Sequence, residues 1–115
     1  MSSAPRDPLV TGVVEIRTTF GSRDEASACG SRLVAGRWAA CVQVEGPLLS
    51  TYRWRTAVET AEEWRCLCKT TVARAAACIA AIVEQHPYET PQVTVTPVEA
   101  TASYAAWVEE SVEAS

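Results

Sequence analysis

Residues 63–70 read EWRCLCKT, and apolar side chains alternate along them with mainly polar ones. On a β-strand such alternation gives two faces. One face would carry Trp64, Cys66 and Cys68, and the other Arg65, Leu67 and Lys69. A longer strand is predicted before it, over residues 39–54, with a bend or bulge at Gly46-Pro47. A polar turn at residues 56–60 would join the two strands, so we expect them to pair antiparallel.

Two helices are predicted on either side of this strand pair. Ser22 and Glu25 match a capping box that begins the first helix, and Gly36 can end it. Its buried residues would be Ala26, Cys29, Leu33 and Val34. Thr71 can cap the second helix, which should end near Gln85. Its buried stripe would be Val72, Ala75, Ala76, Ile79, Ile82 and Val83.

Two more strands and a last helix are predicted nearer the two ends of the chain. Strands are expected at residues 13–20 and 92–98, and a last helix at residues 102–112, with an apolar edge made by Tyr104, Trp107, Val108 and Val112. The order predicts an α+β, ferredoxin-like βαββαβ sandwich with an extra C-terminal helix: a four-stranded antiparallel sheet with both long helices on one face. The other face would be polar, displaying Glu15, Arg17, Gln43, Glu45, Thr94 and Thr96. Self-association would cover it, with Tyr52 and Trp54 on an arm that reaches a neighbouring subunit.

Composition narrows the class of protein. A chain of 115 residues fits one domain, which we place at residues 13–115, after a flexible N-terminal arm at residues 1–12. The formal net charge of −4 gives no basic surface for nucleic acid, and no apolar stretch suggests a membrane span. Five cysteines, an odd number without the spacing of a disulfide framework, favour a reducing cytoplasm.

The chain's only histidine lies in the run His86-Pro87-Tyr88-Glu89-Thr90-Pro91. The two prolines restrict their neighbours to extended geometry, so the polar side chains would stand on a stiff connector. Such a connector can position a functional site. Alternatively, the prolines only end a helix and begin an edge strand.

Several motifs in order resemble one family. They are Ala39-Ala40-Cys41, Ser50-Thr51-Tyr52-Arg53-Trp54, Glu62-Glu63 before Lys69-Thr70, the run at residues 86–91, Pro97-Val98 and Tyr104-Ala105-Ala106-Trp107. Together they resemble the divalent-cation tolerance protein family CutA. The resemblance implies a homotrimer similar to the nitrogen-regulatory PII proteins, and a link to copper and other divalent metals.

The resemblance also implies metal-associated residues, namely Cys41, His86 and Glu89. One thiolate, one imidazole and one carboxylate suit copper or zinc, but a closed tetrahedral site needs four ligands. Two kinds of site are compatible with only three ligands per chain: a site shared between subunits, or a weak open site. Cys66 and Cys68 point to one face of their strand, so they either pack in the core or bind a soft ion such as Cu(I).

No convergent catalytic set is present in the sequence, so we expect a protein that is not an enzyme. The first hypothesis is a trimer that binds metal ions and acts in the response to them. The alternative is a PII-like signalling or scaffold trimer whose inter-subunit cleft takes a small organic ligand or a partner protein. Trp54, Glu63, Lys69 and Tyr88 would then line the cleft.

Overall fold

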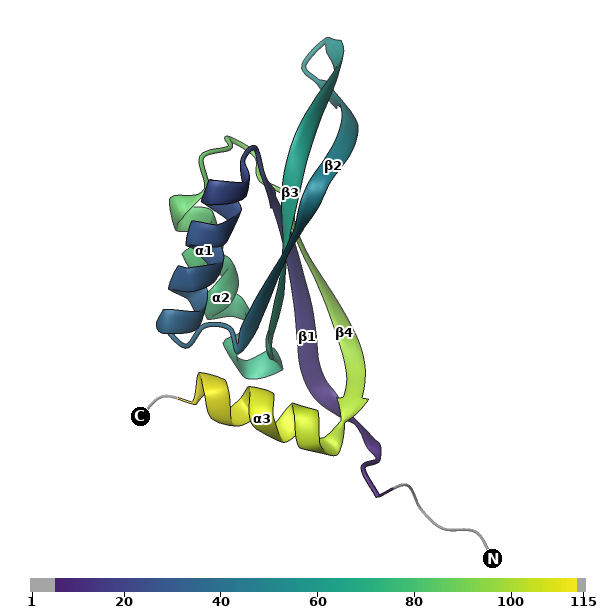
Figure 1. The fold of residues 1–115 in the computed structure, drawn as a ribbon, viewed down its shortest axis with the longest axis vertical. Coiled ribbons are helices and arrows are strands. Elements are labelled where there is room, and N and C mark those ends of the chain that lie inside the picture. Colours follow the sequence, from purple (N-terminus) through teal and green to yellow (C-terminus); the bar gives the residue numbers. More distant parts are fainter. Residues whose placement is uncertain (1–5, 114–115) are drawn as a thin grey trace, which may run out of the picture.

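Four strands and three helices follow one another in the predicted order in a computed structural model that describes residues 6–113 (Figure 1). The elements are β1 (Leu9–Phe20), α1 (Arg23–Ala35), β2 (Cys41–Trp54), β3 (Ala57–Thr71), α2 (Val72–Gln85), β4 (Val93–Thr101) and α3 (Ala102–Val112). The strands form one antiparallel sheet in the order β2-β3-β1-β4. The α+β fold predicted from the sequence is therefore confirmed.

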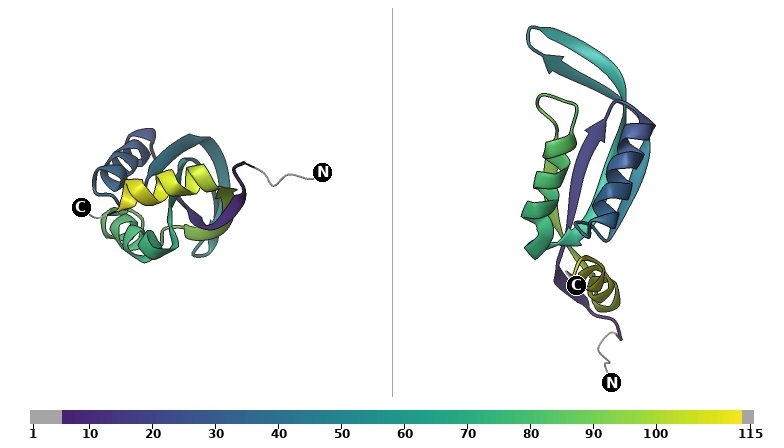
Figure 2. Two further views of the ribbon diagram at one scale, coloured as in Figure 1. Left: turned by 90° about the horizontal axis from the view of Figure 1, so that it is seen from below. Right: turned by 90° about the vertical axis from the view of Figure 1, so that its left-hand side faces the viewer.

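Helices α1 and α2 cover the same face of the sheet, and α3 crosses its lower end (Figure 2). Both long helices begin at the capping residues that the sequence predicts. The side chain of Ser22 accepts a hydrogen bond from the backbone of Glu25 to begin α1, and Thr71 does the same with Arg74 to begin α2. None of the helices within residues 6–113 is long and apolar enough to cross a membrane.

The hairpin of β2 and β3 projects well beyond the helices, which gives the molecule an elongated shape of 61 × 37 × 20 Å (Figure 1). Its register shifts between Glu45 and Leu48, so the bulge predicted at Gly46-Pro47 is confirmed. Strand β3 begins at Ala57, six residues before the predicted start. Of the polar segment that we expected to form the turn, Thr56 does lie in it, whereas residues 57–60 belong to β3 and extend the hairpin arm.

Strand β1 begins at Leu9 rather than Val13, because it pairs with the end of β4 on both sides of an irregularity between Val10 and Val13. Gly12, at φ 112°, adopts a backbone conformation that disfavours a side chain. Residues 9–12 of the predicted flexible arm therefore belong to the sheet, while residues 1–5 lie outside the described residues.

The main core lies between the sheet and the two long helices. Its fully buried side chains include Ile16, Leu33, Cys66, Cys68 and Ile82. The predicted helix stripes were wrong at their margins: Val34, Val72, Ala76 and Val83 are exposed in the subunit, and Ala81 is buried instead. An alanine-rich helix has apolar residues all round, so periodicity alone did not show which side meets the sheet.

A second, smaller core joins α3 to the lower end of the sheet through Val13, Ala40, Val108 and Val112. Of the apolar edge predicted for α3, Val108 and Val112 are buried, whereas Tyr104 and Trp107 remain exposed. Helix α3 thus contacts the sheet along a narrower stripe than expected.

The sheet face away from the long helices is polar, as predicted. Glu15 on β1 pairs with Arg17 at 3.1 Å and with Lys69 of β3 at 3.8 Å. Arg65 pairs with Glu45 at 3.1 Å. These contacts form a charged surface, which we call the outer face.

Candidate functional site

His86 ends α2 and fixes the following loop to β1. Its ring stacks on Phe20 with centroids 4.3 Å apart, and Nε2 lies 2.8 Å from the carbonyl oxygen of Thr19. Nδ1 accepts a hydrogen bond of 3.2 Å from the backbone N–H of Tyr88. An acceptor on one side and a donor on the other define a neutral ring with its proton on Nε2. Burial, which lowers the pKa of His86, favours the same neutral form.

Tyr88 connects the loop after α2 to the hairpin of β2 and β3. Its hydroxyl donates a hydrogen bond of 2.9 Å to a carboxylate oxygen of Glu63 on β3. Burial and this carboxylate raise the pKa of Tyr88 well above its usual range, so the hydroxyl stays protonated. A charge-assisted hydrogen bond therefore holds the loop after α2 against Glu63 of the hairpin.

A cavity of about 590 Å³ lies between the loop and the overhanging hairpin. We call it the hairpin cavity. Aromatic and acidic side chains make up much of its lining: Thr19, Ser50, Tyr52, Arg53, Trp54, Glu59, Glu63, Tyr88, Glu89, Thr90 and Gln92. Its volume falls within the range of small-molecule sites, roughly 300–1,000 Å³. Three residues of the predicted cleft, Trp54, Glu63 and Tyr88, meet here, together with Glu89 from the predicted metal set.

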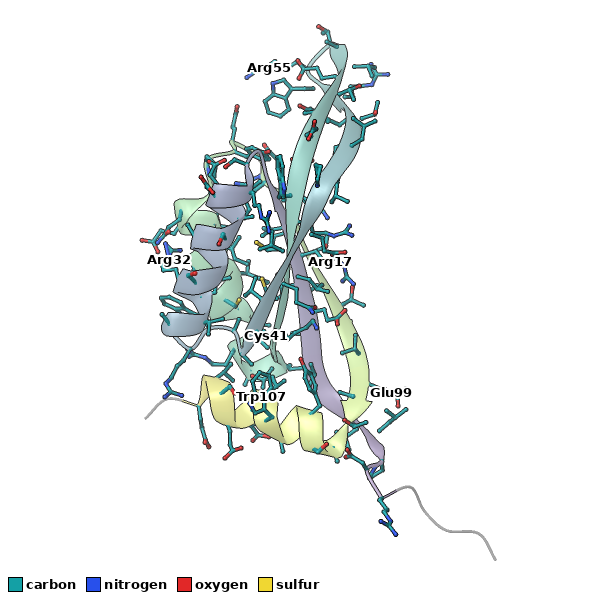
Figure 3. The ribbon with its side chains drawn as sticks, in the orientation of Figure 1. Arg17, Arg32, Cys41, Arg55, Glu99 and Trp107 are labelled. Atoms are coloured by element: carbon teal, nitrogen blue, oxygen red, sulfur yellow. The ribbon has the colours of Figure 1, made fainter. Side chains whose placement is uncertain are left out.

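Arg55 lies at the tip of the hairpin (Figure 3), and its side chain contacts two residues that line the hairpin cavity. Its guanidinium lies 5.3 Å from the centroid of a Trp54 ring and 3.5 Å from a carboxylate oxygen of Glu89. Both charged side chains are 71% exposed, so this ion pair contributes little stability. It does connect the tip of the arm to the loop after α2.

Cys41 and Lys69 lie elsewhere. They are register partners on β2 and β3, and Lys69 pairs with Glu15 on the outer face. Glu15 is four residues from Thr19 along β1, about 13 Å at the rise of a strand. Cys41 is the first residue of β2, whereas Arg55 follows the last one, and Figure 3 shows the two far apart. Within one subunit, Cys41 therefore does not share a site with His86 and Glu89, and Lys69 does not line the hairpin cavity.

The other four cysteines, all in the reduced form, belong to the core between helices and sheet: Cys29, Cys66, Cys68 and Cys78. The thiol of Cys66 donates a hydrogen bond of 3.2 Å to the carbonyl oxygen of Ala26, and burial raises the pKa of Cys68. Both observations favour the core-packing alternative for Cys66 and Cys68. Among residues 6–113, no group of three or more His, Cys, Asp and Glu side chains is placed to hold a metal ion.

Sequence reasoning missed Glu59 and Arg55 as parts of the site. The signal for Glu59 was available: it stands directly opposite Tyr52 in the hairpin, on the face that also carries Trp54 and Glu63. A correctly placed turn would have given this register. Arg55 has φ 58°, in a region where bulky residues are uncommon, and nothing in the sequence marked it as a turn residue.

Comparisons with known proteins agree with this architecture. The family described as CutA1 divalent ion tolerance protein matches residues 14–111. A divalent-cation tolerance protein CutA from Salmonella newport is 33% identical over 92 residues, covering 77% of this chain and 80% of the relative. The crystal structure of CutA from Xylella fastidiosa superposes with a TM-score of 0.86 at 30% identity, covering 89% of this chain and 99% of that one.

CutA from Synechococcus elongatus, solved in complex with a Bis-Tris molecule, gives a TM-score of 0.82 at 30% identity. The match covers 90% of this chain and 97% of that structure. Family profile, sequence relatives and solved structures thus all carry the name of the same family. This chain belongs to the CutA1 family of divalent ion tolerance proteins.

Proposed function

We propose that this chain is the subunit of a cytoplasmic homotrimer that acts in tolerance to divalent cations, copper among them. Family membership is the observation that carries the proposal. The subunit's shape supports an assembly, because the projecting hairpin leaves Leu49 76% and Val58 63% exposed. Neighbouring subunits that pack against the arm would bury these side chains. The mass of the native protein in solution tests this assembly.

Cys41 is the proposed primary ligand of a metal ion, and His86 and Glu89 complete the proposed set. Because Cys41 lies far from the other two within a subunit, a shared ion would have to lie between subunits. Both ring nitrogens of His86 already have partners, so binding through His86 would also displace the backbone of Thr19 or Tyr88. Cys41 has no such restriction, since its side chain is partly exposed.

Calorimetric titration of the reduced, metal-free protein with Cu(I) and Cu(II) tests the metal proposal. We expect saturable binding at an integral ratio per trimer that is lost in Cys41→Ser. Glu84→Gln, which removes an exposed carboxylate from α2, is a control for Glu89→Gln. Unchanged binding in Cys41→Ser, His86→Ala and Glu89→Gln would remove all three residues from the proposal.

A second proposed function is the binding of a small organic molecule, and the hairpin cavity is the specific observation in its favour. Its volume, its aromatic lining and the fixed position of Tyr88 are features of a preformed ligand site. The Bis-Tris complex of the cyanobacterial relative gives a precedent for organic ligands in the family. Such a role is non-enzymatic, which fits a histidine whose two nitrogens contact backbone groups rather than a nucleophile.

A thermal-shift screen separates the two functions, because a ligand that binds only the native state raises its stability. Stabilisation by metabolites but not by metal ions supports the second function, and the reverse supports the first. The screen should use the assembled protein at one fixed concentration.

A further inference from the structure

We propose that the hairpin cavity selects an organic cation, such as an amine or a quaternary ammonium group. This inference rests on the proposal that the cavity is a ligand site, and it adds the chemical class of the ligand. It is drawn from the charges, the rings and one internal contact of the cavity.

The charges that line the cavity are mainly negative. Glu59, Glu63 and Glu89 contribute three carboxylates, whereas Arg53 contributes the one guanidinium of the lining. A recessed surface of one sign concentrates ligands of the opposite charge and repels those of its own. The cavity should therefore admit cations in preference to anions.

Aromatic rings stand beside these carboxylates. Tyr52, Trp54 and Tyr88 line the cavity, and Tyr52 is directly opposite Glu59 in the register of the hairpin. The face of an aromatic ring attracts a cation, most strongly for tryptophan, and the attraction grows when the cation is partly desolvated. A ring and a carboxylate side by side offer an ammonium group both kinds of contact.

The chain's own Arg55 already makes this pair of contacts with two residues of the cavity lining. Its guanidinium lies 5.3 Å from a Trp54 ring and 3.5 Å from Glu89. The Arg55 side chain is 71% exposed, so a ligand can displace it at small cost. The geometry thus shows that Trp54 and Glu89 can hold a cation together.

The test uses choline as the probe, on the assembled wild-type protein in phosphate buffer, which contains no amine. The matched comparison is 3,3-dimethylbutan-1-ol, which has the shape of choline without its charge, and acetate is the anionic probe. Titration is followed by calorimetry. We expect saturable binding of choline, binding of the uncharged alcohol weaker by about tenfold or more, and no binding of acetate.

Matched variants locate the binding. Trp54→Leu and Glu63→Gln should each weaken choline binding by about tenfold. Glu63→Gln keeps an oxygen that can accept the Tyr88 hydroxyl, so the loop should stay in place. Trp107→Leu removes another exposed tryptophan, on α3, and Glu62→Gln removes the neighbouring carboxylate that does not line the cavity. Both control variants should bind choline like the wild type.

Each other outcome overturns a defined part of the inference. Equal binding of choline and the uncharged alcohol, or preferential binding of acetate, would refute the choice of a cation but leave the cavity as a ligand site. Choline binding that survives both Trp54→Leu and Glu63→Gln would refute the location. Absence of binding by all three probes would refute the inference, and a negative metabolite screen would additionally refute the ligand site.

Discussion

Removing the hydroxyl of Tyr88 should release the loop after α2 from the hairpin. Tyr88→Phe leaves the ring in place and deletes only the donor of the 2.9 Å hydrogen bond to Glu63. A hydrogen bond to a charged group contributes about 1.5–3 kcal/mol when it is well buried. Since Tyr88 and Glu63 are only partly buried, water can replace part of it. We therefore expect a coupling of about 1 kcal/mol, or about fivefold in the unfolding equilibrium constant.

A double-mutant cycle measures this coupling directly. The free energy of unfolding in urea is compared for the wild type, Tyr88→Phe, Glu63→Ala and the double variant, at one protein concentration because assembly contributes to stability. Tyr104→Phe is the control, since its hydroxyl has no hydrogen-bond partner among residues 6–113. A coupling within about 0.3 kcal/mol of zero would refute the reasoning that this bond fixes the loop.

Three further predictions concern the core, the thiols and pH. Ile16→Ala should lower the free energy of unfolding by about 3 kcal/mol because Ile16 is fully buried, whereas Val72→Ala, at an exposed helix position, should be nearly neutral; urea unfolding checks both. In a chromogenic thiol assay one cysteine, Cys41, should react in the folded protein and five after denaturation; a second fast thiol would contradict the buried core. Burial lowers the pKa of His86 below 6.5 despite nearby Glu25 and Glu63, so at this residue the unfolded state binds more protons than the folded state. The free energy of unfolding should therefore fall as the pH drops below about 6.5. This dependence on pH should be weaker in His86→Gln.

Sequence reasoning succeeded where the signal is local. The caps at Ser22 and Thr71 depend on side chains within three residues of the backbone groups they satisfy, and both are present. Alternation along residues 63–70 correctly placed Cys66 and Cys68 on the core face. These features need no knowledge of distant parts of the chain.

It was less successful where distances along a strand and the position of a turn decide which side chains meet. Glu63 and Lys69 were expected in one inter-subunit cleft, but six residues of strand separate them by about 20 Å within a subunit, so only side chains of different subunits could meet there. The hairpin turn was placed in a polar segment because its actual corner, Arg55-Thr56, lacks the glycine or asparagine that marks a tight turn. That error shortened the arm and concealed the register that brings Glu59 to Tyr52.

The family-like run at residues 86–91 has a structural role that bears on any metal experiment. His86 binds the backbone of β1, Tyr88 binds Glu63 of the hairpin, and Glu89 pairs with Arg55 at the tip. His86→Ala would therefore disturb the hairpin cavity as well as delete an imidazole, so loss of copper binding in this variant alone does not identify a ligand. Tyr88→Phe makes the distinction: it loosens the same loop but leaves His86 and Glu89 intact. If His86 ligates the metal, Tyr88→Phe should retain copper binding; if His86 acts by positioning the loop, both variants should lose it.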